Sequence, residues 1–493
     1  MVFLLKRFVY MPKPFVVLVL IATFVVTPDN IARCADLPPL RWAADAEGGA
    51  PYIFKNPNNP EENMGFEVDL AKAFEKELGR KIVFKQYSFD SLVIGLERGD
   101  FDFAMNGLEV TPDRQKRLRL SKPYYKYRLQ FVSRFDESRF FSLQQCKAVG
   151  GVVGTLGDTA ALRLLEARGM KAKIYDSQVE PYQDLEHGRI DAVLLDEPIA
   201  VYYALKNPKL RFVGEPFAEG YYAIGFRKDQ EELAQQFDAA IDRLESRGEL
   251  RAIGEKWETP KGDILTTSGK GFTFSTYFPL LAAAAWVTVK VSVMSMALAM
   301  FLGLPIALAR LYGPPPVRGL AIAYVEFFRG IPVLLLLYLL YYGIPSLLAQ
   351  YGIPISNPTD LQVAVLAFGL NYAAYESEIY RAGISSIPVG QWEAAASLGM
   401  SRPLTFRRII LPQALRIMTP PVTNDFVALF KDTSLVSVIA LVELTKQYQI
   451  LAKSSAKYME IGLATAALYL LMSVPLGYLA RYLEKLWGRG IVS

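Results

Sequence analysis

The stretch Phe101-Asp-Phe-Ala-Met-Asn-Gly-Leu-Glu-Val-Thr-Pro-Asp-Arg114 decides the fold of the first half of the chain. Residues 101–105 are short and mostly apolar, as expected of a buried strand. Thr111 followed by Pro112 is typical of a helix start, because threonine caps the first turn and proline fits its first position. A strand that leads directly into a helix indicates an α/β fold, in which ligands bind at the carboxyl ends of parallel strands.

The same alternation extends over residues 36 to about 262. Strands are predicted at 40–46, 81–87, 101–105, 148–153, 172–175 and 190–195, and helices at 65–79, 91–97, 158–168 and 179–186. These runs form two series, so we expect a two-lobed α/β domain with a cleft between the lobes. Lobe 1 would span about 36–132 and 222–262, and lobe 2 about 133–221.

The second half of the chain has a different composition. The whole sequence of 493 residues is 52% hydrophobic and 21% charged, which suggests one soluble part and one membrane part. Five apolar runs are each long enough to cross a hydrocarbon core of roughly 30 Å, namely 281–309, 319–344, 361–380, 415–441 and 458–480. We therefore expect a linker at 263–276 and an all-α membrane domain of about five helices at 277–493.

Charge predicts the orientation of these helices, because cytoplasmic loops favour Lys and Arg. The loops expected inside carry Arg310, Arg318, Arg381, Arg402, Arg407, Arg408, Arg481, Lys485 and Arg489. The outer loop 345–360 carries neither Lys nor Arg, whereas the one near 446–457 carries three lysines. The balance places the amino-terminal domain outside the cytoplasmic membrane.

Residues 1–35 are predicted to be a signal peptide. Lys6, Arg7 and Lys13 form a basic start, and residues 15–26 form an apolar core that is short for a membrane span. Cleavage is expected near residues 32–35. The alternative is an uncleaved anchor.

Residue counts restrict the chemistry. There is one histidine, His187, and there are two cysteines, Cys34 and Cys146, so a His/Cys metal cluster, a Ser–His triad and a disulfide framework are not expected. The sequence contains no Gly-x-x-x-x-Gly-Lys-[Ser/Thr] phosphate loop. We expect no catalytic residue, no metal and no cofactor on this chain. A net charge of +5 is no signature of nucleic-acid binding.

Two charged residues are candidates for ligand contacts. Arg114 lies in the first turn after Thr111 and could clamp a carboxylate in a bidentate manner, or it could be an ordinary surface arginine. Asp196 ends a predicted strand and could hold an ammonium group, or it could cap the helix that starts near Pro198. Gly107 would let a ligand approach the backbone closely.

Residues 40–258 resemble the extracytoplasmic solute-binding proteins for polar amino acids. The resemblance rests on the order of Gly65-Phe-Glu-Val-Asp-Leu-Ala, Thr111-Pro-Asp-Arg114, Ser121-Lys-Pro-Tyr-Tyr125, Gly154-Thr155, Gly188-Arg-Ile-Asp-Ala-Val and Lys256-Trp257. It implies that Arg114 binds the ligand α-carboxylate, Asp196 the α-ammonium, and that Phe89 packs on the ligand side chain. Thr155 and its neighbours match a second-lobe loop at a helix N-terminus, which suits an anion.

The chain departs from this family at two positions. The family usually has Ser or Thr two residues after Gly107, where this chain has Glu109, and an aromatic residue where it has Gly49. The cleft wall would then be built with Tyr52 or Glu47. Glu109 either faces the cleft and favours a ligand with an additional cationic group, or it points to solvent or pairs with Arg114.

A second resemblance concerns Gly390-Gln-Trp-Glu-Ala-Ala-Ala-Ser-Leu-Gly399 and the following Ile409-Ile-Leu-Pro412. This segment is similar to the coupling loop of ATP-binding-cassette importer permeases of the amino-acid branch. The resemblance implies that Glu393, Ala394, Ala395, Gly399, Leu411 and Pro412 dock a separate cytoplasmic ATPase, which uses the ATP. Alanines allow close packing, and Gly399 stops the helix.

Together, the two resemblances imply amino-acid import across the cytoplasmic membrane, with the binding domain outside and a homodimer completing the pathway. A ligand-gated channel, a sensor and a small dehydratase-like enzyme are the alternatives, because each can share this binding fold.

Overall fold

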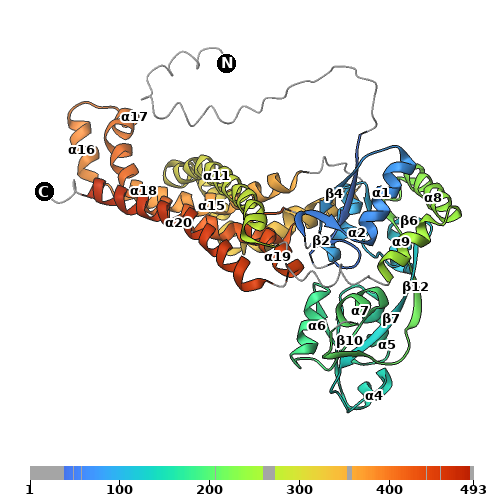
Figure 1. The fold of residues 1–493 in the computed structure, drawn as a ribbon. Helices are drawn as coiled ribbons and strands as arrows, with labels where there is room; N and C mark the ends of the chain where they lie inside the picture. Colours follow the sequence, from blue (N-terminus) through green and yellow to red (C-terminus); the bar gives the residue numbers. More distant parts are fainter. Residues whose placement is uncertain are drawn as a thin grey trace. The chain divides into compact units, whose positions relative to one another are not determined.

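The computed structural model (Figure 1) describes residues 38–258, 272–351 and 358–488, apart from residues 48, 57, 206, 440 and 456. The predicted signal peptide and residues 263–271 of the predicted linker lie outside this part of the chain. The first membrane-half helix begins at Phe274, within the range predicted as linker.

Lobe 1 is built on a five-stranded sheet in the order β4-β1-β5-β13-β6. Its strands are β1 (Leu40–Ala44), β4 (Ile82–Gln86), β5 (Phe103–Ala104), β6 (Arg119–Leu120) and β13 (Gly225–Phe226), with a separate hairpin of β2 (Phe54–Asn56) and β3 (Asn59–Met64). Its helices are α1 (Phe66–Leu78), η2 (Phe89–Ser91), α2 (Leu92–Arg98), α3 (Pro112–Arg117), α8 (Glu231–Ser246) and α9 (Glu249–Glu258). β1 pairs in parallel with β4 and β5, as the alternating pattern predicts.

Lobe 2 has a second sheet in the order β11-β7-β10-β8-β9, with β12 paired to β7. Its strands are β7 (Tyr125–Arg134), β8 (Val152–Leu156), β9 (Lys171–Tyr175), β10 (Ala192–Asp196), β11 (Leu210–Phe212) and β12 (Phe217–Tyr222). Its helices are α4 (Leu143–Ala148), α5 (Ala160–Ala167), α6 (Val179–Glu186) and α7 (Glu197–Ala204), and Figure 1 shows α5, α6 and α7 around the strands β7 and β10. Because the whole of β7 pairs within this sheet, the chain enters the second sheet at Tyr125.

One predicted strand is wrong in its position. Residues 148–153 were expected to be extended, but α4 runs to Ala148 and the strand β8 begins only at Val152. The Ser142 side chain caps α4 by accepting a hydrogen bond from the Gln145 amide at 3.2 Å. This cap starts a helix just before the predicted strand, and the helix takes up Ala148, the first residue of that strand.

The membrane half consists of helices. They are α11 (Phe274–Tyr312), α12 (Pro315–Gly330), α13 (Val333–Tyr338), η3 (Leu339–Gly343), α14 (Ile344–Gln350), α15 (Asp360–Ser385), α16 (Val389–Ser397), α17 (Arg402–Thr405), η4 (Phe406–Ile410), α18 (Leu411–Asp432), η5 (Thr433–Val438), α19 (Leu444–Ser455) and α20 (Tyr458–Gly488). By length and composition, two described helices can cross a membrane, Phe274–Tyr312 and Tyr458–Leu479, and a third span results if one bent pair is counted. α15 and α18 occupy two further predicted spans, but they contain more charged residues than the two helices named above.

One expectation for the membrane half is corrected. The predicted span 319–344 is broken by a bend of 101° between Gly330 and Val333. Pro332 explains this bend, because it lacks an amide hydrogen and forces Ile331 into an extended conformation. The predicted outer loop at 446–457 contains the helix α19.

Candidate functional site

Arg114 lies where the strand-to-helix pattern predicts, in the first turn of α3. The Thr111 hydroxyl accepts a hydrogen bond from its amide at 3.2 Å, which confirms the predicted helix cap. The Arg114 side chain is 3% exposed and is therefore no surface arginine. Its guanidinium donates to the Glu109 carbonyl at 3.1 Å and to the backbone and side chain of Asp158 at 3.0 and 2.7 Å. Arg114 thus reaches from lobe 1 to lobe 2.

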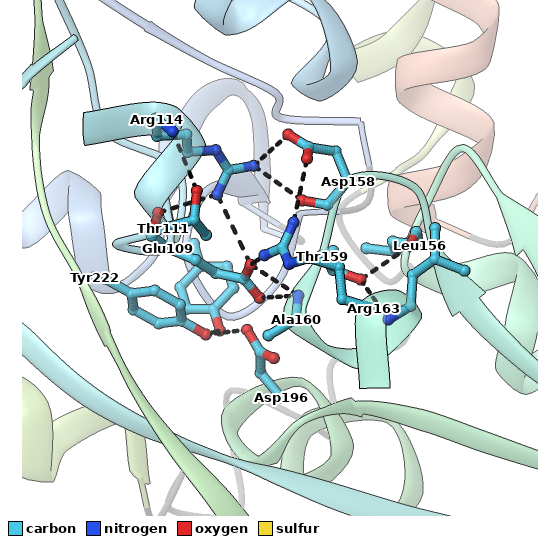
Figure 2. Close-up of polar contacts among 12 residues, drawn as sticks. Glu109, Thr111, Arg114, Leu156, Asp158, Thr159, Ala160, Arg163, Asp196 and Tyr222 are labelled. Atoms are coloured by element: carbon cyan, nitrogen blue, oxygen red, sulfur yellow. Dashed lines mark hydrogen bonds and ion pairs between the residues drawn. The ribbon is translucent and has the colours of Figure 1, made fainter. Parts of the chain in front are cut away.

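Glu109 faces the cleft between the lobes (Figure 2) and is 2% exposed. Its two carboxylate oxygens accept hydrogen bonds from the Ala160 amide, at 2.9 and 2.8 Å, at the N-terminus of α5. Arg163 of the same helix forms an ion pair with Glu109 at 2.8 Å, and Arg114 lies 3.8 Å away. Burial raises the pKa of the Glu109 carboxyl, and these donors oppose the rise. Glu109 therefore faces the cleft and also pairs with Arg114, and it does not point to solvent.

Asp196 ends β10 and faces the same cluster of side chains in Figure 2. It occupies the cap position of α7, but its side chain makes no capping hydrogen bond. Instead it accepts a hydrogen bond from the Tyr222 hydroxyl, which lies 2.6 Å from the Tyr52 hydroxyl. Burial raises the pKa of Asp196 well above its usual range, and the Glu109 charge raises it further. An ammonium group at this place would stabilise the charged form of Asp196.

Gly107 has a φ of +60°, a conformation that favours glycine. A Cβ atom at Gly107 would lie 3.2 Å from the Tyr52 ring. Its amide donates to the buried Glu67 carboxylate at 2.6 Å, and Tyr124 donates to the same carboxylate. Gly107 is therefore held by lobe 1 itself.

A small cavity of about 20 Å³ remains between the two lobes. It is lined by Asp45, Glu47, Gly49, Phe89, Asp90, Asn106, Leu156, Tyr175, Asp176, Ser177 and Gln178. Phe89 lies on its wall, and its ring centroid is 5.9 Å from the Arg114 guanidinium. Thr155 is fully buried in β8, and its hydroxyl has no hydrogen-bond partner among the described residues.

Several residues of this site were missed by sequence reasoning. Asp158 and Arg163 complete the charged cluster, Tyr222 donates a hydrogen bond to Asp196, and Asp45 lines the cavity. A signal existed for Asp158 and Arg163, because both lie within the predicted helix 158–168 that follows Thr155. Nothing local in the sequence distinguishes Tyr222, which is placed by the pairing of β12 with β7.

The predicted coupling segment forms the helix α16, followed by α17, which packs against it (Figure 1). Glu393 and Ala394 are exposed, whereas Ala395 is buried. The helix ends at Ser397, and Gly399 just beyond it has a φ of +74°, which confirms the predicted glycine stop. Leu411 begins α18, and Pro412 stands in its first turn.

The chain matches two protein families. Bacterial extracellular solute-binding proteins, family 3, match residues 40–260, and the inner membrane component of binding-protein-dependent transport systems matches residues 297–489. Both predicted resemblances, and the fold class that they imply, are thereby confirmed.

Similar proteins cover one half of the chain each. An L-cystine transport system permease protein of Bacillus subtilis is 38% identical over 209 residues, which are 42% of this chain and 87% of the relative. The glutamine transport system permease protein of Escherichia coli is 35% identical, over 42% of this chain and 92% of the relative. A solved structure of an ancestral arginine-binding protein bound to glutamine is 32% identical, with a TM-score of 0.42, over 45% of this chain and 98% of that protein. The chain belongs to the family of inner membrane components of binding-protein-dependent transport systems, and it carries a family 3 solute-binding domain in the same polypeptide.

Proposed function

We propose that this chain is the combined substrate-binding and permease subunit of an ATP-binding-cassette importer for amino acids. The observation that carries this proposal is the presence of a ligand cleft and a coupling helix in one polypeptide. The permease relatives transport amino acids by name, which supports the same class of cargo here. The chain has no phosphate-loop motif, so ATP hydrolysis is assigned to a separate ATPase.

The α-carboxylate and the α-ammonium group of an amino acid each have a candidate partner in the cleft. Arg114 is a donor for the α-carboxylate, and Asp196 is an acceptor for the α-ammonium. The two side chains are close enough that the Arg114 charge lowers the pKa of Asp196, against the larger effect of burial. A zwitterion between them would satisfy both charges at once.

The charge of the cavity supports a cationic amino acid as the ligand. Asp45, Glu47, Asp90 and Asp176 line the cavity, whereas neither Lys nor Arg does. Glu47 is paired with Lys446 at 3.1 Å, so the three aspartates are the candidate partners of a cationic ligand. Burial raises the pKa of Asp90, and Asp176 and Asp45 raise it further, so like charges are held together at a cost. A guanidinium or ammonium side chain would relieve this repulsion.

The partners follow from the membrane half. Exposed residues of α16 are assigned to the contact with the ATPase. Two copies of the chain would form one pathway, which gives two binding domains per transporter. We place the binding domain on the extracytoplasmic side of the cytoplasmic membrane, where tethering keeps it at a high effective concentration near the permease.

The test is uptake of labelled L-arginine and L-glutamine by vesicles that contain this chain and its ATPase. Uptake that requires ATP and favours arginine supports the proposal. Flux without ATP would favour a ligand-gated channel, and uptake of neither amino acid would contradict the assigned cargo.

A further inference from the structure

Glu109 joins the two lobes through its own side chain. It is mounted rigidly, because its backbone pairs with Tyr222 and the neighbouring Val110 amide donates to the Tyr221 carbonyl at 2.8 Å. From there its side chain crosses to lobe 2 and contacts the Ala160 amide and the Arg163 guanidinium (Figure 2). The Arg114 pair with Asp158 crosses the cleft beside it.

The place that Glu109 occupies is built for an anion. The N-terminus of α5 carries a partial positive charge and presents the Ala160 amide, and Arg163 adds a full charge. Two further donors in this region have no acceptor among the described residues, the Arg114 Nε and the Thr155 hydroxyl, and both side chains are more than nine-tenths buried. The donor set therefore exceeds what the Glu109 carboxylate satisfies.

The lobes are closed around little space. The cavity of about 20 Å³ between them has room for about one water molecule and none for an amino acid. Contacts of the protein with itself cross between the lobes, and Glu109 contributes a charged acceptor at their centre.

We propose that Glu109 is an internal competitor for the carboxylate of the ligand, holding the lobes closed until a ligand carboxylate displaces it from α5 and Arg163. This inference rests on the proposed function, since it takes an amino acid as the ligand. The carboxylate that enters takes over the donors that Glu109 leaves, together with those that lack an acceptor. The observed association constant of the ligand then equals the intrinsic association constant multiplied by the fraction of the protein in which the lobes are open.

The first experiment measures binding by calorimetry on the full chain in lipid nanodiscs. The variant Glu109→Ser puts a small hydroxyl residue in place of the competitor, and Glu109→Gln keeps the size but removes the charge. If about 1–10% of the wild type is open, Glu109→Ser binds L-arginine about 10- to 100-fold more tightly. Agmatine, which is arginine without its carboxylate, gains only from the opening of the lobes and should therefore gain less affinity than L-arginine. Glu166→Gln, at an exposed position of the same helix, is the matched control.

The second experiment reads the closure directly and needs no ligand. Spin labels at Lys72→Cys in α1 and Lys147→Cys in α4 report the distance between the lobes, in a background with Cys34→Ala and Cys146→Ala. The ligand-free wild type should show the short distance, and Glu109→Ser should shift to a longer one that L-arginine shortens again. Glu109→Gln should lie between the two.

Two results would overturn the proposal. One is an identical ligand-free distance in the wild type and in Glu109→Ser. The other is an equal gain of affinity for agmatine and L-arginine, which would mean that Glu109 does not compete with a carboxylate. If neither protein binds any amino acid, the proposed cargo fails, whereas the distance still tests whether Glu109 holds the lobes.

Discussion

The cleft of the binding domain and the helix α16 present their functional residues in opposite ways. In the cleft, Glu109, Arg114 and Asp196 are buried, and each has a partner within the chain. On α16 and its end, Val389 is 69% exposed and Leu398 is 80% exposed. Buried charges need partners at all times, whereas exposed apolar side chains gain when a second protein covers them. The buried charges of the cleft are thus paired within one chain, whereas α16 leaves large apolar side chains exposed.

The largest effect on ligand affinity is expected from Asp196→Asn, which tests whether the buried charges of the cleft bind the ligand. Loss of one partner in a buried charge pair costs about 3–5 kcal/mol, so L-arginine should bind more than about 100-fold more weakly. Calorimetry measures this change. The neighbouring Glu197→Gln, which removes only a surface pair with Arg128, should stay within a few-fold of the wild type. Unchanged binding by Asp196→Asn would remove Asp196 from the site.

The second prediction concerns pH and the buried side of the comparison. Glu67, which accepts a hydrogen bond from the Gly107 amide, is a buried acid, and Glu67→Gln removes its titration. Burial raises the pKa of Glu67 from 4.5 to about 7. The folded domain therefore keeps a proton that the unfolded chain releases, and stability should fall as pH rises from about 4.5 to 7, by at most about 3 kcal/mol. Glu67→Gln should remove this slope in thermal unfolding, whereas Glu62→Gln, at an exposed position, should keep it. An unchanged slope in Glu67→Gln would assign the pH dependence to other groups.

Leu398→Glu tests the other half of the comparison. If a partner covers this side chain, its burial contributes about 2 kcal/mol, and the charge should weaken ATPase binding about 30-fold. Titration of the ATPase against nanodiscs measures this loss, while the affinity for L-arginine should not change. Phe135→Glu, at a residue that is 67% exposed in the binding domain, is the control. Equal ATPase affinity in both variants would exclude Leu398 from the interface.

The smallest effect is expected at Gly399, where only the backbone conformation is at issue. Its φ is +74°, and a Cβ atom there would meet no atom within 4 Å. Gly399→Val should cost about 1–2 kcal/mol and lower ATP-driven uptake roughly tenfold, whereas Gly399→Asn should be milder, because asparagine tolerates this conformation. If both variants behave alike, side-chain volume rather than backbone strain decides the outcome.

Much of this molecule was predictable from short-range chemistry. The cap at Thr111, the strand that ends in Asp196 and the stop at Gly399 each depend on a few neighbouring residues, and the structure confirms all three. The bend at Pro332 was missed because an apolar run was read as one span, although the proline itself marks the break.

The partners of Glu109, in contrast, could not be predicted from short-range sequence patterns. The sequence indicated that a carboxylate stood beside the place of a ligand carboxylate, and it left open whether that side chain faced the cleft. Ala160 and Arg163 lie 51 and 54 residues further along the chain, so no local pattern could name them. Capping, helix periodicity and proline effects act within a few residues and can be read from the sequence. A charge pair across a cleft depends on how the two lobes are placed in the folded protein. The competition of Glu109 with a ligand could therefore be inferred only from the tertiary structure.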